Sequence, residues 1–146
     1  MSQESVEVVQ RVLTIAQRGV GDPGAVFDEW VREGLVARNV EWRAGGRGGM
    51  AVAGLDDVAG REGYLNVARI WTEDFDEIAL ETEQVLDAGD DRVVAIMRVS
   101  GRSKGGQAPV EIRTGMVCTL QSRQIVRIAP FINPDHALNA MELGGF

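Results

Sequence analysis

The sequence predicts an α+β fold in which helices precede an antiparallel sheet. Apolar residues recur at helical spacing up to about residue 75, and they alternate with a period of two from residue 78 onward. The 146 residues are enough for one domain with a sizeable core. We find no internal repeat and no linker, so we expect a single domain over residues 1–146.

Three segments of the first half are expected to be helices. The first spans residues 3–18, and the second, residues 22–34, opens with Asp22-Pro23, an N-cap followed by proline at the first helical position. The third, residues 61–75, carries a stripe of large apolar side chains: Tyr64, Val67, Ala68, Trp71 and Phe75. Such a stripe is typical of a helix that packs on a core or forms the wall of a cavity.

Strands account for most of the rest of the chain. A short strand is expected over residues 37–43, followed by the glycine-rich loop Gly45–Gly49. Four longer strands, over residues 78–87, 92–102, 108–120 and 125–132, are joined by short turn-rich segments, which favours an antiparallel meander. A last helix is expected over residues 135–143. Alternation groups side chains by face, but it does not identify the concave face, because a one-residue shift exchanges the two faces.

Composition restricts the partners and the compartment. The net charge of −7 argues against DNA, RNA or a membrane surface as a partner. No apolar run reaches the ~20 residues of a membrane helix, and the N-terminus shows no export signal. The single cysteine, Cys118, cannot form an internal disulfide, which fits a reducing compartment. We therefore expect a cytoplasmic location.

Several short motifs, in this order, resemble the SnoaL-like branch of the NTF2-like superfamily, which includes polyketide cyclases and ketosteroid isomerases. The motifs are Met1-Ser-Gln-Glu-Ser-Val-Glu-Val-Val-Gln10, Val40-Glu-Trp-Arg43, Gly60-Arg-Glu-Gly-Tyr64, Leu86-Asp-Ala-Gly-Asp-Asp-Arg-Val-Val94 and Gln124-Ile-Val-Arg127. The second and third, about twenty residues apart, are the most specific pair. The resemblance implies a cone-shaped curved antiparallel sheet wrapped around the N-terminal helices, known as a cystatin-like α+β barrel. It also implies an internal apolar pocket and a homodimer.

The same resemblance implies where catalytic acids would lie. Burial in an apolar pocket raises the pKa of a carboxyl group, which lets the group act as a base or a neutral donor near pH 7. The aspartate positions of isomerase-like relatives fall at Trp42 and near Arg113, and that of cyclase-like relatives falls at Met116. None of these residues is an acid, so the known isomerase and cyclase chemistry is not expected.

An aromatic pocket with one or two arginines is the remaining candidate binding site. Its candidate lining is Trp42, Arg43, Tyr64, Trp71, Arg113 and Phe131. In the alternative interpretation the aromatic residues belong to the core, and Arg113 pairs with Glu111, Glu81 or Glu83 on the sheet surface.

Three other residues are candidate catalysts. Glu41 alternates with Trp42, so only one of the two points into a pocket, and Glu111 depends in the same way on which face is concave. His136, the only histidine, follows Asp135 at the start of the last predicted helix. One histidine and one cysteine far apart in the sequence do not predict a metal site, and the Gly45–Gly49 loop lacks a phosphate-loop signature. No cofactor is expected.

The sequence therefore leaves three functions open. The first is binding of a small apolar or aromatic molecule in the cone. The second is a lyase, isomerase or hydrolase that uses an atypical acid. The third is a non-catalytic dimeric scaffold whose cone is filled by its own side chains.

Overall fold

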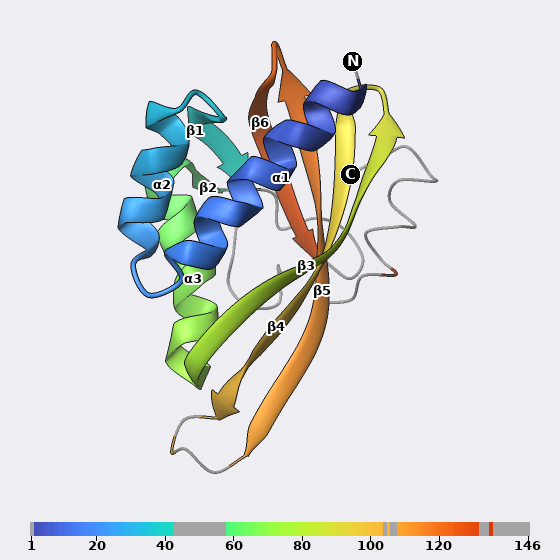
Figure 1. Cartoon of the computed structure of the whole chain (residues 1–146). Coiled ribbons are helices and arrows are strands. Elements are labelled where there is room, and N and C mark those ends of the chain that lie inside the picture. Colours follow the sequence, from blue (N-terminus) through green and yellow to red (C-terminus); the bar gives the residue numbers. More distant parts are fainter. Residues whose placement is uncertain (1, 43–57, 104, 106–107, 132–134, 136–146) are drawn as a thin grey trace.

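The computed structural model describes residues 2–42, 58–103, 105, 108–131 and 135. The helices are α1 (Ser2–Arg18), α2 (Pro23–Arg32) and α3 (Gly60–Asp74). The strands are β1 (Val36–Trp42), β2 (Val58–Ala59), β3 (Phe75–Gly89), β4 (Arg92–Ser103), β5 (Pro109–Gln121) and β6 (Gln124–Phe131). Helices thus precede most of the sheet, as the change in apolar period predicts (Figure 1).

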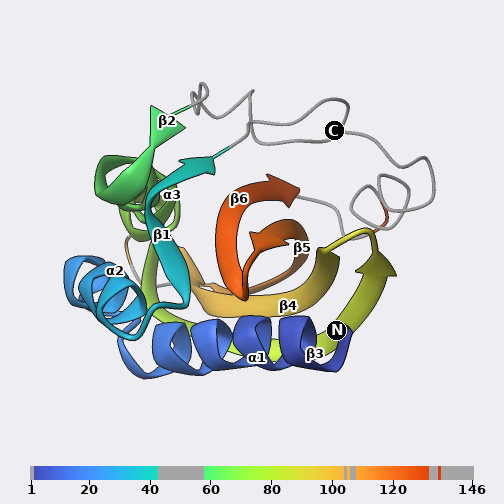
Figure 2. The same cartoon turned by 90° about the horizontal axis from the view of Figure 1, so that it is seen from above.

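All strands belong to one six-stranded sheet with the order β2-β1-β6-β5-β4-β3. The predicted meander is confirmed, because the consecutive pairs β3–β4, β4–β5 and β5–β6 are all antiparallel. The sheet as a whole is mixed, however, since β1 pairs with β6 in parallel. Seen from above, the sheet is strongly curved, and α1 runs along it while α2 and α3 lie beside β1 (Figure 2). The expectation of a purely antiparallel sheet is therefore wrong for this one pair of strands.

The main core lies between the helices and one side of the sheet, which we call the helix-facing side. On β4 and β5 this side carries alternate residues: Val93, Ala95, Met97, Met116, Cys118 and Leu120. A second buried cluster contains the intervening residues Val94, Ile96, Val117, Ala129 and Phe131. The opposite side of the sheet is called the outer face below. The period-two pattern thus separates two sets of apolar side chains.

Local signals explain the helix boundaries. The Asp22 carboxylate accepts a hydrogen bond of 3.2 Å from the Ala25 amide, and Pro23 occupies the first turn of α2, as expected for an N-cap followed by proline. The third helix ends earlier than predicted, because Phe75 is the first residue of β3. The predicted helix over residues 135–143 and the Gly45–Gly49 loop fall outside the described residues. None of the described helices is both long and apolar enough to cross a bilayer.

The two tight hairpin turns adopt left-handed backbone conformations. Asp90 and Asp91 have φ angles of 53° and 60°, and Ser122 and Arg123 have φ angles of 51° and 65°. Positive φ at both central residues is the pattern of a type I′ turn, whose twist matches that of the flanking strands. The predicted turn positions are therefore confirmed, although no glycine stands at these four central positions.

Candidate ligand cavity

A cavity of about 150 Å³ lies between the helices and the helix-facing side of the sheet. The three helices and the turn between α1 and α2 contribute these lining residues: Val12, Leu13, Ala16, Val20, Pro23, Trp30, Tyr64, Val67 and Ala68. Strand residues complete the lining: Trp42, Ile78, Leu80, Met97, Val99, Thr114, Gly115, Met116, Ile128 and Pro130. None of these described lining residues carries a charge, so the cavity favours uncharged contents.

Three aromatic side chains form one wall of this cavity. The Tyr64 ring lies at the centre, 4.6 Å from the Trp30 ring and 5.5 Å from the Trp42 ring, measured between centroids. Phe27, which is buried behind them, has its ring centroid 6.3 Å from that of Tyr64. Such tilted and stacked arrangements within about 7 Å stabilise aromatic pairs beyond their burial. The wall is therefore held by mutual packing of residues from α2, α3 and β1.

The most specific pair of sequence motifs forms part of this wall. The Trp42 indole donates a hydrogen bond of 3.1 Å to the carbonyl oxygen of Gly60. It also lies against Gly63, where an added Cβ atom would come within 2.2 Å of the indole Cδ1. Tyr64 follows directly and packs on the same indole. The two motifs are thus in direct contact, because the indole of Trp42 from the first touches Gly60, Gly63 and Tyr64 of the second.

Tyr64 differs from the two tryptophans in its hydrogen bonding. Trp30 donates from Nε1 to the Val12 carbonyl oxygen at 3.0 Å, and Trp42 donates to Gly60. Tyr64 makes no hydrogen bond with any described residue, and burial raises the pKa of its hydroxyl to about 12. The Thr114 hydroxyl donates to the carbonyl oxygen of Phe131. Tyr64 is thus the one side-chain donor without a partner among the described lining residues.

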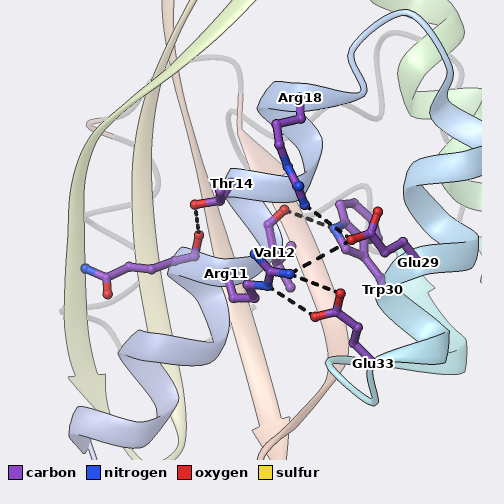
Figure 3. Close-up of polar contacts among 8 residues, drawn as sticks. Arg11, Val12, Thr14, Arg18, Glu29, Trp30 and Glu33 are labelled. Atoms are coloured by element: carbon purple, nitrogen blue, oxygen red, sulfur yellow. Dashed lines mark hydrogen bonds and ion pairs between the residues drawn. The ribbon is translucent and has the colours of Figure 1, made fainter.

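Ion pairs join α1 to α2 and to Glu33, the residue that caps the C-terminus of α2, and both helices line the cavity (Figure 3). Arg11 donates from Nε and Nη2 to the two carboxylate oxygens of Glu33, both at 3.1 Å. Arg18 donates to Glu29 at 3.2 Å. The hydrogen bond from Arg11 lowers the pKa of the Glu33 carboxyl, and the same bond raises the pKa of Arg11. These pairs hold the two helices side by side at the surface.

Arg113 does not line the cavity, and that prediction is corrected. On β5, Thr114 and Met116 face the cavity, whereas Arg113 lies on the outer face. Its Nε lies 2.8 Å from Oε1 of Glu83, whose Oε2 lies 3.2 Å from Nε of Arg98. Arg98 and Arg113 stand directly opposite each other on β4 and β5, so Glu83 separates two like charges. The alternative prediction, a cross-strand ion pair, is confirmed.

Phe131, Glu41 and Glu111 also lie away from the cavity. Phe131 is 2% exposed and belongs to the second apolar cluster. Glu41 is exposed on the opposite side of β1 from Trp42, and Arg127 donates to it at 3.3 Å. Glu111 lies on the outer face of β5, 3.7 Å from Nη1 of Arg98. Alternation along a strand accounts for all three positions, because their neighbours in the chain occupy the helix-facing side.

Trp42 and Tyr64 line the cavity, and their contact with a ligand stays a prediction. Met116, one of the positions where the resemblance implied an acid, lines it too. Arg43, His136 and the Gly45–Gly49 loop lie outside the described residues, as does the side chain of Trp71. Within the described part of the chain, no three His, Cys, Asp or Glu side chains gather as metal ligands would.

Sequence reasoning missed the place of Trp30 in the cavity wall. Trp30 lies within the predicted second helix but was not among the candidate lining residues, and its side chain is buried. The helical spacing placed it on the inner face of that helix, but the spacing alone does not tell a packed core from a cavity wall. For a polar group in the cavity the available signal was Thr114, which shares its face of β5 with the apolar residues Ile112 and Met116.

No family model and no curated protein matches this chain. Solved structures do match its fold. An NTF2-like protein of unknown function from Burkholderia pseudomallei is 15% identical, with a TM-score of 0.64 over 94% of this chain and 97% of that one. A putative SnoaL-like polyketide cyclase from a Jannaschia species is 19% identical, with a TM-score of 0.63 over 95% and 92%. TerC, co-crystallised with polyporic acid, is 17% identical, with a TM-score of 0.64 over 95% and 98%. These likenesses span nearly the whole chain and confirm the predicted fold.

Proposed function

Given the NTF2-like fold of this chain, we propose that it binds a small, uncharged apolar or aromatic molecule in the cavity. The observation that carries this proposal is the apolar cavity walled by Trp30, Trp42 and Tyr64. Aromatic side chains around a concave apolar space, with few polar groups, are typical of small-molecule sites. TerC, a protein of similar fold, is co-crystallised with an organic molecule, polyporic acid, which supports ligand binding as a use of this fold.

The cavity volume favours a ligand of about one ring. At about 150 Å³ it is smaller than the several hundred Å³ of sites for drug-sized ligands. An engineered apolar cavity of about 150 Å³ in another protein binds benzene, so this volume accommodates a single aromatic ring. The same small volume favours the second candidate function, a non-catalytic scaffold whose cone is filled. Binding of a one-ring compound distinguishes the two.

Catalysis by Glu41 or Glu111 is not part of this proposal. Both side chains lie on the outer face and pair with arginines, so neither reaches a molecule in the cavity. A general base must come within hydrogen-bond distance, about 2.6–3.2 Å, of the proton that it removes. The predicted homodimer remains a separate proposal, which light scattering after size-exclusion chromatography tests directly.

Thermal unfolding with one-ring compounds tests the proposed binding. Acetophenone and α-methylstyrene have the same shape and differ in a C=O against a C=CH₂ group. A ligand at ten times its Kd adds about 1.4 kcal/mol to the free energy of unfolding. That is a rise in Tm of about 3–6 °C in a domain of this size. We expect such a rise with at least one of the two compounds.

A cavity-filling variant shows whether binding occurs in this cavity. Ala68 lines the cavity on α3, so Ala68→Leu occupies part of its volume and should abolish the rise in Tm. Ala25 is exposed on α2, and Ala25→Leu is the matched control that should keep the rise. No shift with either compound contradicts the proposal and favours the filled scaffold. An unchanged shift in Ala68→Leu places binding elsewhere and also contradicts it.

A further inference from the structure

The side chains of the cavity wall that can donate a hydrogen bond do not all have a partner. Four described lining residues have such a side chain: Trp30, Trp42, Tyr64 and Thr114. Three of them donate to backbone carbonyl oxygens, those of Val12, Gly60 and Phe131. The Tyr64 hydroxyl has no hydrogen-bond partner among the described residues. A partly buried hydroxyl without a partner in the protein can bond only to water or to a ligand, so an acceptor that enters this apolar cavity can take its hydrogen bond.

From this arrangement, and resting on the proposed function, we infer that Tyr64 selects ligands that carry a neutral hydrogen-bond acceptor, such as an aromatic ketone or aldehyde. Tyr64 would donate its hydroxyl proton to that acceptor while the ring of the ligand fills the apolar space. The chemical class is thus a compact, uncharged ring compound with an acceptor oxygen or nitrogen, rather than a plain hydrocarbon or a carboxylate.

The protonation state of Tyr64 supports a role as donor. Because burial raises the pKa of the hydroxyl to about 12, the group stays protonated throughout the physiological pH range and keeps its proton for donation. A carboxylate ligand would need a cation to offset the loss of its hydration. No lining residue in the described part of the chain provides one. A neutral acceptor avoids this cost.

The surrounding packing keeps the donor in one place. The Tyr64 ring is packed by Phe27, Trp30 and Trp42, with centroid distances of 6.3, 4.6 and 5.5 Å. Trp30 and Trp42 are in turn tied to the backbone through their indole nitrogens. A donor held by buried aromatic rings does not need to be ordered when the ligand arrives, so it discriminates well between ligands.

A thermodynamic cycle isolates this hydrogen bond. The Kd values of acetophenone and α-methylstyrene are measured by calorimetry for the native chain and for Tyr64→Phe. This variant keeps the ring and removes a hydroxyl that has no hydrogen-bond partner among the described residues, so it is expected to fold. Acetophenone should bind about five- to tenfold more weakly to the variant, whereas the affinity for α-methylstyrene should be unchanged or higher. Benzoate, the charged probe, should bind the native chain more weakly than acetophenone does.

A second measurement uses the fact that Tyr64 is the only tyrosine in the chain. A ¹³Cζ label on tyrosine therefore gives one resonance, which should shift with acetophenone and much less with α-methylstyrene. Equal losses for both ligands in Tyr64→Phe, or no loss for either, overturn the inference while the proposed function stands. Benzoate binding as tight as that of acetophenone overturns the choice of a neutral ligand. If neither neutral compound binds the native chain, the proposed function fails and this inference fails with it.

Discussion

Replacing Gly63 with alanine brings a methyl group against the Trp42 indole. Gly63 is a buried residue of α3, and a Cβ atom built there lies 2.2 Å from Cδ1 and 2.8 Å from Nε1 of the indole. Ordinary van der Waals contact begins at about 3.4 Å. The indole must therefore move by about 1 Å or more, although it is 4% exposed and bonded to the Gly60 carbonyl oxygen.

Two opposing effects set the size of the change. Alanine in place of glycine within a helix stabilises by about 1 kcal/mol. Overpacking a buried site costs about 1–3 kcal/mol, and weakening the buried bond from Trp42 to Gly60 costs about 1 kcal/mol more. We therefore expect Gly63→Ala to lower the free energy of unfolding by about 2 kcal/mol. In a domain of this size that lowers Tm by about 4–8 °C.

Gly24→Ala provides the matched control for this measurement. Gly24 is also helical, in α2, and a Cβ atom there would meet Nη2 of Arg61 at 2.5 Å. The side chain of Arg61 is 51% exposed, so its flexible end can move away at little cost. We expect this variant to change stability by less than about 1 kcal/mol, in the stabilising direction if at all.

Calorimetry of the native chain and both variants gives Tm, and tryptophan fluorescence reports on the indole environment. The expected result is a lower Tm and a changed emission for Gly63→Ala only. If Gly63→Ala were as stable as Gly24→Ala, with unchanged emission, the indole would not be confined against α3. The explanation that the two motifs contact each other through the indole of Trp42 would then be wrong.

Three further predictions concern charge, burial and backbone conformation. Glu33→Gln should be less stable than the native chain at pH 7. Because the bond from Arg11 lowers the pKa of Glu33 in the folded state, that difference should vanish as the pH falls below the ordinary carboxyl value of 4.5 and through the lowered value; an equal difference at pH 3 contradicts this. Burial raises the pKa of the Cys118 thiol from 9.0 to about 12, so the unfolded chain alone releases this proton above pH 9. Stability should therefore decline between pH 9 and pH 12, and less so in Cys118→Ala, as measured by urea unfolding. Ser122→Asn should raise the urea midpoint by the equivalent of about 0.5 kcal/mol, because asparagine tolerates a φ of 51° better than serine does; a lower midpoint argues against strain in this turn.

The sequence by itself predicted which side chains share a face. Alternation along the predicted strand 92–102 gives Val93, Ala95, Met97 and Val99 the same side, and all four are buried on the helix-facing side. It also separated Glu111 and Arg113 from their apolar neighbours. These predictions succeed because side-chain direction along a strand depends only on local geometry. The helical stripe predicted Tyr64 and Val67 as wall or core residues for the same reason.

Only the tertiary structure decided which face encloses the cavity. The apolar and the charged residues of β5 are distinguished by alternation, but their assignment to the inside or the outside depends on where the helices pack. In the structure, Arg113, Glu41 and Glu111 therefore lie outside the cavity, whereas Trp42 lines it.

Local sequence patterns also could not predict contacts between segments that are far apart in the chain. Glu41 and Arg127 are 86 residues apart in the chain, yet they pair because β1 lies parallel to β6. The indole of Trp42 likewise meets Gly63, which lies about twenty residues further along the chain in another element. Local periodicity carries no information on which distant strands or helices meet. That choice follows from the burial of all apolar faces at once, and it decides which side chains surround the cavity.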